Sequence, residues 1–192
     1  ATGAITWDAL TASDNVGVDS TTSSHNSGDA FVVGSTSVSY TATDAASNSA
    51  TCTFDVIIVD DDKPVYDSCP SSTVVNTDLG VSTAVVTYTV SASDAVDSTV
   101  DVSLVTGLSS GSSFPLGSTN VTYQAVDDEG NTAFCSFTVT VSDSQGPVWN
   151  TCPSDIDSFT DDGFNFGTVT WDLPSASDNV AVTNVVSTYN SG

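Results

Sequence analysis

The sequence predicts an all-β protein built from tandem sandwich repeats of about 83 residues. Val, Thr and Ser dominate the composition while Met is absent, so strand and turn formers replace the best helix formers. Short segments alternate apolar and polar residues with the period of a β-strand. A set of residues also recurs along the chain at a constant spacing. Because 39% of the residues are hydrophobic, the chain has enough apolar side chains for a core and is not disordered by composition.

The repeat is defined by three residues that recur at an offset of 83 residues: Tyr40 as Tyr123, Cys52 as Cys135, and Cys69 as Cys152. Residues 34–40 and 117–123 align without a gap. A third aromatic position is marked by Trp7, Tyr88 and Trp171, at offsets of 81 and 83 residues. Since repeats decide the architecture, this period predicts units of the size of one immunoglobulin-like β-sandwich.

The strands expected within each unit follow from the alternation. Residues 38–42, 121–125 and 137–141 place Val, Tyr, Phe or Ala on one face and Ser, Thr or Gln on the other. Residues 5–7, 86–88 and 169–171 each supply a bulky aromatic. We expect these aromatic residues to lie in the cores.

The period divides the chain into three parts. Residues 1–62 are expected to form a partial repeat that lacks its first strand, residues 63–145 a complete repeat, and residues 146–192 the first part of a third. The sequence therefore resembles a window cut from a periodic array.

Charge excludes two classes of partner. The chain has 24 acidic residues against one basic residue, Lys63, and a formal net charge of −23. Nucleic acids and anionic membrane surfaces are bound through Lys and Arg, so neither is expected as a partner. No apolar run approaches the roughly 18 residues of a membrane-spanning helix, so membrane insertion is not expected either.

The middle repeat contains a spaced set of residues: Cys69-Pro70, residues 114–117, Thr119, Val121, Tyr123, Ala125, Asp127, Gly130-Asn131, Ala133, Cys135, Phe137, Val139 and Val141. With this set the repeat resembles the HYR (hyalin repeat) family of extracellular immunoglobulin-like modules. The resemblance implies an extracellular or cell-surface location. The N-terminal repeat departs from the family pattern, because Ala46-Ser47-Asn48 stands where the family prefers Gly-Asn. We expect a looser turn there.

The four cysteines indicate disulfides and an oxidising compartment. Zinc binding is less supported, because no two cysteines have a close ligand spacing and His25 is the only histidine. The family resemblance implies a Cys69–Cys135 disulfide. Cys52 and Cys152 are then left without their partners within a repeat.

Two explanations of these unmatched cysteines stay open. In the first, copies of the chain assemble head to tail, with residues 147–153 of one copy against the N-terminal domain of the next and Cys152 bridging to Cys52. In the second, the natural polypeptide is longer and the sequence is one window of it.

Aspartates suggest a cation site. They cluster at Asp60, Asp61 and Asp62 between repeats, and at Asp127 and Asp128. Carboxylate and turn carbonyl oxygens suit Ca²⁺, but the alternative is that Asp caps turns and keeps the surface solvated. No cofactor is required by this sequence. Asn120 begins the one N-glycosylation sequon, Asn120-Val121-Thr122.

Catalysis finds little support, since His25 lies in a polar turn without a counterpart in the other repeats. The favoured function is a structural subunit of an extracellular filament or adhesive repeat array. The alternative is a non-catalytic accessory module that binds a glycan or receptor. The predicted partners are copies of the chain and, on the alternative, other extracellular proteins or glycans. Exposure of Trp149 on an isolated face is expected to favour binding, and burial at a junction to favour assembly.

Overall fold

The computed structural model describes residues 4–189, and every regular element among them is a β-strand. This agrees with the predicted fold class. Across that range no helix is long and apolar enough to cross a membrane. The chain divides into two compact units, Ala1–Asp61 and Asp62–Gly192.

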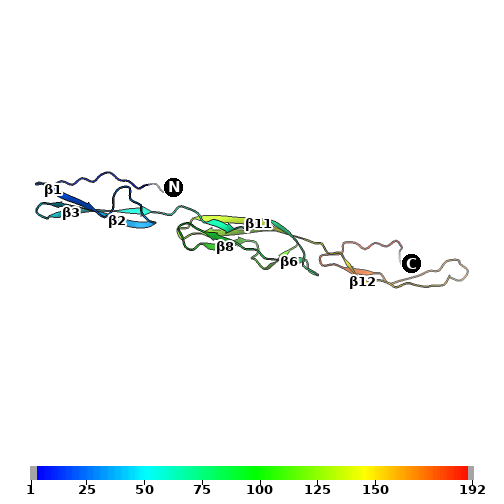
Figure 1. Cartoon of the computed structure of the whole chain (residues 1–192). Helices are drawn as coiled ribbons and strands as arrows, with labels where there is room; N and C mark the ends of the chain where they lie inside the picture. The colour runs from blue at the N-terminus through cyan, green and yellow to red at the C-terminus, as the bar shows by residue number, and fades with distance from the viewer. Residues whose placement is uncertain (1–3, 190–192) are drawn as a thin grey trace. The chain divides into compact units, whose positions relative to one another are not determined.

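Unit 1 is built on a three-stranded antiparallel sheet (Figure 1). Its strands, in the order β1-β2-β3, are β1 (Val18–Ser23), β2 (Gly34–Asp44) and β3 (Ser49–Ile58). β2 and β3 form a long hairpin in which Tyr40 lies opposite Cys52. Val38 and Val56 are its buried apolar side chains, and the ring of Trp7 packs edge-on against Phe54 at 5.2 Å between centroids.

The turn of this hairpin corrects the expectation of a loose connection. The Asp44 N–H donates to the Asn48 carbonyl at 3.0 Å and the Ser47 N–H to the Asp44 carbonyl at 3.1 Å. Asp127, Gly130 and Asn131 make the same two bonds in the middle repeat, at 3.2 and 3.3 Å. Ser47 therefore adopts a left-handed φ of 66° where Gly130 has 90°, and the turn is retained at the cost of an unfavourable backbone conformation.

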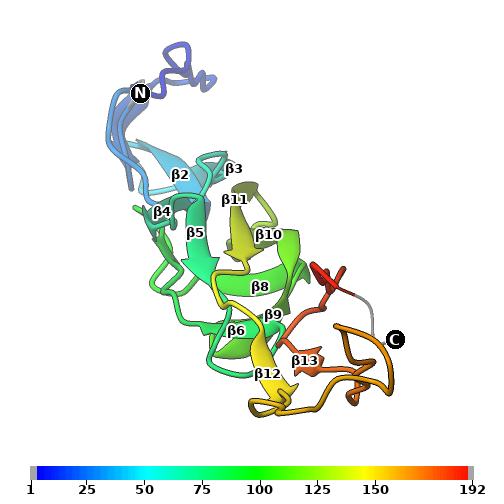
Figure 2. The same cartoon turned by 90° about the vertical axis from the view of Figure 1, so that its right-hand side faces the viewer.

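Unit 2 holds the middle repeat, which forms a sandwich of short sheets (Figure 2). Its strands are β4 (Val65–Ser68), β5 (Thr73–Asn76), β6 (Thr83–Val86), β7 (Ser91–Ser93), β8 (Asp101–Thr106), β9 (Ser112–Pro115), β10 (Gly117–Val126) and β11 (Thr132–Ser142). The main sheet has the order β5-β11-β10-β8, and the pairs β4-β7 and β6-β9 complete the structure. β5 joins β11 in parallel, whereas the other pairings are antiparallel.

The core of the middle repeat lies between these sheets. Alternation along β10 and β11 turns their apolar side chains inward, as the sequence predicts. The buried cluster comprises Ala84, Val86, Phe114, Val121, Cys135, Phe137, Val139 and Val141. Tyr88 packs edge-on against Phe137 at 4.9 Å, so the aromatic marker of the repeat is a core residue.

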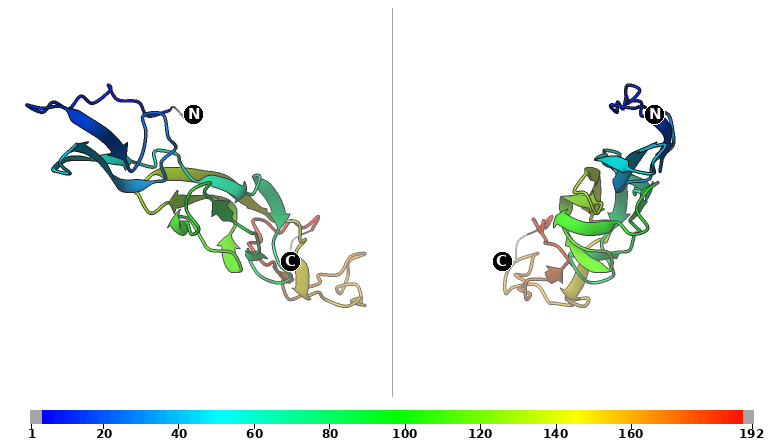
Figure 3. Two further views of the ribbon diagram at one scale, coloured as in Figure 1. Left: turned by 60° about the vertical axis from the view of Figure 1, so that its left-hand side comes forward. Right: turned by 90° about the vertical axis from the view of Figure 1, so that its left-hand side faces the viewer.

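The C-terminal segment, residues 146–189 as described, is mostly irregular (Figure 3). Its regular part is the antiparallel pair of β12 (Val148–Thr151) and β13 (Ser175–Ser177), which repeats the β4-β7 pair of the middle repeat. The side-chain amide of Asn179 donates to the Thr77 hydroxyl at 3.2 Å, the Val81 carbonyl at 2.9 Å and the Asp143 carboxylate at 3.2 Å. These bonds attach the segment to the middle repeat within unit 2.

Candidate functional site

Cys69 and Cys135 form a disulfide within the middle repeat, as the family resemblance implies, with Cα atoms 5.8 Å apart. The bond joins the segment between β4 and β5 to the first half of β11. Cys135 is only 2% exposed, and the neighbouring Tyr66 of β4 packs against the same core cluster. Burial raises the pKa of the Tyr66 hydroxyl above its ordinary value. The Cys-Pro segment thus covers the inner face of the main sheet.

Cys52 and Cys152 are free and exposed. Cys52 occupies in β3 the position that Cys135 occupies in β11. It lies opposite Tyr40 in the hairpin register, as Cys135 lies opposite Tyr123. The structure gives unit 1 no counterpart of β4 or β5 among its described residues, 4–61.

A cavity of about 270 Å³ lies in unit 1, on the face of the β2-β3 hairpin that carries Tyr40 and Cys52. Residues lining it include Leu10, Ala12, Tyr40, Ala42, Ala50 and Cys52. In the middle repeat the residue equivalent to Ala42 is Ala125, which is fully buried, whereas Ala42 is half-buried. The cavity is therefore on the face that the Cys-Pro segment covers in the complete repeat.

The outer edge of β3 is also open, because β2 is its only partner in the sheet of unit 1 as described. Ile57 and Val59, which flank the last residue of β3, are 67% and 68% exposed. In the middle repeat the matching edge of β11 is occupied by β5, with Val139 opposite Thr73. An open strand edge offers unpaired N–H and C=O groups to another chain.

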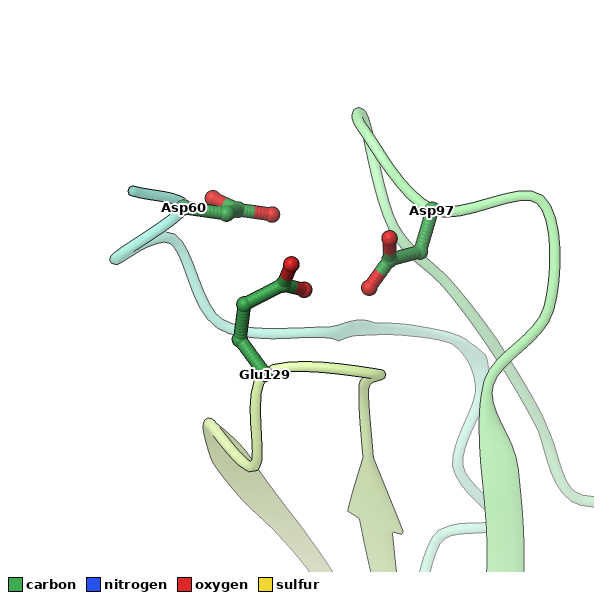
Figure 4. Close-up of side chains that lie close together, drawn as sticks. All are labelled: Asp60, Asp97 and Glu129. Atoms are coloured by element: carbon green, nitrogen blue, oxygen red, sulfur yellow. The ribbon is translucent and has the colours of Figure 1, made fainter. Parts of the chain in front are cut away.

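The acidic residues of unit 2 gather on two loops. The Asp128 N–H donates to the Asp97 carboxylate at 3.0 Å, which joins the β7-β8 loop to the β10-β11 turn. Carboxylate oxygens of Asp97 and Glu129 lie within 4.8 Å of each other; Figure 4 draws both side chains, together with that of Asp60. Asp97 was not among the residues predicted for a cation site, because only the pairing of the strands brings its loop to this turn.

Asp127 differs from the residues around it. Its side chain is 7% exposed, and Oδ1 accepts the Asn131 N–H at 2.6 Å. The other oxygen, Oδ2, is buried and has no hydrogen-bond partner. A buried carboxylate oxygen without a donor is costly, and either a bound water or a cation would satisfy this atom. Of the aspartates that link the units, Asp60 is buried, and Asp61 and Asp62 are exposed.

Three other predicted positions lie on the surface or in turns. Asn120 is exposed on β10, where its side-chain oxygen accepts the Thr138 hydroxyl at 2.9 Å. The His25 ring packs against Phe31 at 5.2 Å, and its Nδ1 lies 3.2 Å from the Ser24 hydroxyl. Trp149 is 54% exposed, whereas Tyr66, its equivalent in the middle repeat, packs on the core.

The exposure of Trp149 does not separate the two function classes. Other large apolar side chains of the C-terminal segment are exposed as well, among them Phe159, Phe164, Phe166 and Leu173. The segment holds β12 and β13 but no counterpart of β10 or β11 up to residue 189. Trp149 is therefore exposed because nothing in the described segment covers it.

Comparison with known proteins agrees with this geometry. The HYR domain family matches residues 1–58 and 59–141. Hyalin from Strongylocentrotus purpuratus is 39% identical over 176 residues, which cover 86% of this chain and 14% of that protein. Hyalin from Lytechinus variegatus is 37% identical over 174 residues, covering 88% and 32%. The chain thus spans less than a third of the length of either relative.

A more distant relative is a mosaic protein. The "Sushi, von Willebrand factor type A, EGF and pentraxin domain-containing protein 1" of Rattus norvegicus is 31% identical over 146 residues, covering 73% of this chain and 4% of that protein. These relatives are extracellular or cell-surface proteins. The matched residues include both hairpins, the Cys69–Cys135 disulfide and the core aromatics. The chain therefore belongs to the HYR domain family.

Proposed function

We propose that the chain is a non-catalytic structural subunit of an extracellular filament or adhesive array, in which copies assemble head to tail. The HYR repeats shared with the two hyalins support an adhesion-type module. The disulfide of the middle repeat supports an oxidising, extracellular compartment.

The observation that carries the proposal is the pair of exposed free cysteines, Cys52 and Cys152. Each occupies one of the two positions that form the disulfide in the complete repeat. Unit 1 carries the half with the hairpin, and the C-terminal segment carries the half with the Cys-Pro segment. A contact between these halves on different copies is heterologous, so it extends into an open filament unless it closes a ring.

Charge sets the conditions for such assembly. Copies with a net charge of −23 repel one another, so strand pairing, apolar burial and the disulfide must supply the contacts. Salt at about 0.15 M screens exposed charges beyond roughly 8 Å. We therefore expect assembly to be stronger in 0.15 M NaCl than at low ionic strength.

Non-reducing electrophoresis, disulfide mass mapping and electron microscopy test the proposal. The expected result is a ladder of oligomers that contain the Cys52–Cys152 peptide pair, with filaments or short chains in the images. Cys52→Ser, the matched control, should remove the ladder while leaving the Cys69–Cys135 disulfide intact. Dispersed monomers with both thiols free at 0.15 M NaCl and under oxidising conditions contradict the proposal.

We further propose that Ca²⁺ binds the acidic loops of unit 2 through Asp97, Asp127, Asp128 and Glu129. The buried, unsatisfied Oδ2 of Asp127 supports a cation there. Asp60, Asp61 and Asp62 are further candidate ligands, because three adjacent aspartates lie between two repeats in the sequence. With the roughly millimolar affinity of extracellular modules, 10 mM Ca²⁺ should stabilise unit 2 by about 1–3 kcal/mol.

Thermal unfolding with and without Ca²⁺ tests this site. Asp127→Asn keeps the acceptor for the Asn131 N–H, so it should abolish the Ca²⁺-induced rise in Tm without unfolding the turn. Asp101→Asn, at the start of β8, should leave that rise unchanged. An equal Tm in 10 mM CaCl₂ and in chelator removes the proposed site.

The second candidate function is an accessory module that binds a glycan or another extracellular protein. Its candidate contact is Trp149, whose exposed ring offers a platform for a ligand. Quenching of tryptophan fluorescence by glycans, compared between the wild-type chain and Trp149→Ala, separates this function from assembly. Saturable quenching that Trp149→Ala removes, in a chain that stays monomeric, would favour the binding module.

A further inference from the structure

We infer that one end of the middle repeat is a receiving surface for the opening turn of the repeat that follows it, and that a single side-chain amide of that turn holds the two repeats together. The receiving residues are Thr77, Val81 and Asp143, and the amide belongs to Asn179. The contact lies within one chain, so it does not depend on the proposed assembly of copies. The inference names the residue that decides whether two successive repeats form a fixed joint.

The receiving surface lies where two parallel strands end. β5 ends at Asn76 and β11 at Ser142, and these two residues are opposite each other in the parallel pairing. Thr77 and Asp143 directly follow them, so their side chains meet, and the Thr77 hydroxyl donates to Oδ1 of Asp143 at 3.3 Å. Thr77 is only 8% exposed. The sheet therefore fixes the positions of both residues.

Gln145 braces this surface from the segment that leads to the next repeat. Its backbone N–H donates to Oδ1 of Asp143 at 3.1 Å. Its side-chain amide donates to the Thr77 hydroxyl at 3.1 Å and to the Asp78 carbonyl at 2.9 Å, and its Oε1 accepts the Gly80 N–H at 2.9 Å. These bonds do not involve Asn179, so the acceptors for its amide are held in place independently of it.

The turn that carries the amide recurs in all three repeats. In each turn the aspartate carboxylate accepts the N–H of the residue two positions later, at 2.8, 2.8 and 2.9 Å. The turns are Ser13-Asp14-Asn15, Ser93-Asp94-Ala95 and Ser177-Asp178-Asn179. Because the aspartate fixes the local backbone in the same way each time, the residue after it is the variable part. Alanine there has no side-chain donor, so the turn of the middle repeat cannot make this bond.

The chemistry of the acceptors fixes the orientation of the Asn179 amide. Its nitrogen lies 2.9 Å from the Val81 carbonyl and 3.2 Å from the Asp143 carboxylate. Both of these groups only accept hydrogen bonds, so the NH₂ end of the amide must face them. An aspartate at position 179 would have nearly the same size but would turn a second carboxylate toward Asp143. This substitution therefore separates the role of the donor from that of side-chain volume.

Exchange of side-chain amide protons tests the bond in the unmodified chain. Asn15 is exposed in the same turn of unit 1 and serves as the internal reference. The amide protons of Asn179 should exchange with water at least about tenfold more slowly than those of Asn15, because hydrogen bonds to a charged acceptor are among the stronger ones. Equal exchange rates overturn the inference.

Distances between two spin labels test whether the amide holds the joint. One label is attached to the exposed Cys152, which directly follows β12, and β12 pairs with β13 just before the turn. The other is attached to Ser103→Cys at an exposed position of β8, in a chain that also carries Cys52→Ser. The pair thus reports on the orientation of the β12-β13 sheet relative to the middle repeat. The expected distance distribution is single and narrow.

Three variants of the labelled chain separate the possible causes. Asn179→Ala, which copies Ala95, should replace the narrow distribution with a broad one. Asn179→Asp should do the same, because its carboxylate is repelled by Asp143. Asn15→Ala, the matched control, changes the same turn in unit 1 and should keep the narrow distribution.

Two results contradict the joint. A distribution that is as broad without these substitutions as with Asn179→Ala overturns the inference, and so does a narrow distribution with Asn179→Asp. Neither measurement depends on the formation of oligomers. A chain that stays monomeric but shows the expected exchange rates and distances therefore loses the filament and keeps the joint.

Discussion

The hydroxyl of Ser110 accepts the backbone N–H of Tyr88 at 2.8 Å and donates to the carbonyl oxygen of the same residue at 2.7 Å. Ser27 makes the same pair of bonds with Trp7 in unit 1, at 2.9 and 3.1 Å. A loop serine thus replaces a strand partner for the aromatic residue of each repeat. The aromatic side chain is held in the core because its backbone groups are satisfied.

Removal of this hydroxyl should destabilise the middle repeat. Ser110→Ala leaves two backbone groups of Tyr88 to water, and we expect a loss of about 1 kcal/mol. Chemical denaturation of the full chain measures it. Ser113→Ala, on the exposed side of β9, is the control and should change stability by less than about 0.5 kcal/mol. Equal effects of the two variants would show that the bonds between the Ser110 hydroxyl and the Tyr88 backbone do not contribute to stability.

Ser47→Gly should stabilise unit 1. Ser47 has a left-handed φ of 66°, which costs a non-glycine residue about 1–2 kcal/mol, while glycine loses about 0.5–1 kcal/mol of backbone entropy on folding. The expected net gain is a few tenths to about 1 kcal/mol. The reverse change, Gly130→Ser in the middle repeat, should destabilise by a similar amount. Thermal unfolding measures the stability of both variants. If Ser47→Gly lowers the stability, the left-handed backbone of Ser47 is not strained.

Reduction of the Cys69–Cys135 disulfide should destabilise the middle repeat strongly. The two cysteines are separated by 66 residues, and closure of such a loop contributes about 4 kcal/mol in the chain-entropy model. The double variant Cys69→Ala/Cys135→Ala should unfold at lower denaturant than the wild type, and dithiothreitol should shift only the wild type. If dithiothreitol has no effect on the wild type, the bond contributes nothing to stability.

Acid should loosen the attachment of the C-terminal segment. The Gln145 N–H first, and then the Asn179 amide and the Thr77 hydroxyl, lower the pKa of Asp143 below its ordinary value of 3.8 by donating to the carboxylate. A lowered pKa means that the folded state favours the ionised form. The stabilisation is therefore present above pH 3.8 and is lost as the pH falls through the lowered pKa.

The pH dependence of the Asn179 side-chain amide signals measures this loss. In the wild type they should shift toward solvent-exposed values below pH 3.8. In Asp143→Asn, which does not titrate, that transition should be absent. A transition of the same size in both proteins would assign it to another carboxylate.

Asn120 should carry a glycan when the chain is secreted from a eukaryotic cell. Its side chain is exposed on β10, so an attached glycan would point into solvent. Treatment with a peptide N-glycosidase should lower the mass of the wild type and convert Asn120 to aspartate. Asn120→Gln is the control, and an unglycosylated wild type contradicts the prediction.

Much of the fold could be predicted from local pattern. Alternation along residues 121–125 and 137–141 predicted β10 and β11 and the buried faces of both, because period 2 decides which side chains point inward. The repeat offset predicted that Tyr88 and Trp7 hold equivalent core positions. The residues of the candidate cation site could be predicted only in part. Asp97 is distant in sequence from the β10-β11 turn, and only the pairing of the strands brings its loop to that turn.

Equivalent segments of different repeats show that the local sequence pattern does not by itself decide whether a strand forms. Ser-Ala-Ser forms β7 at residues 91–93 and β13 at residues 175–177. In both places it pairs with the strand that directly precedes the Cys-Pro dipeptide, β4 or β12. The matching residues 11–13 of unit 1, Thr-Ala-Ser, form no strand. In the same way β5 is a strand beside β11, while residues 156–159 are irregular.

The amino-acid sequence thus determined the period, the faces and the core of each repeat, because these depend on which side chains avoid water. Tertiary structure decided which of two equivalent segments in different repeats becomes a strand, and which cysteine is buried. A strand exists only where a neighbour satisfies its backbone hydrogen bonds, and for β3 and Cys52 that neighbour is absent from the described part of unit 1.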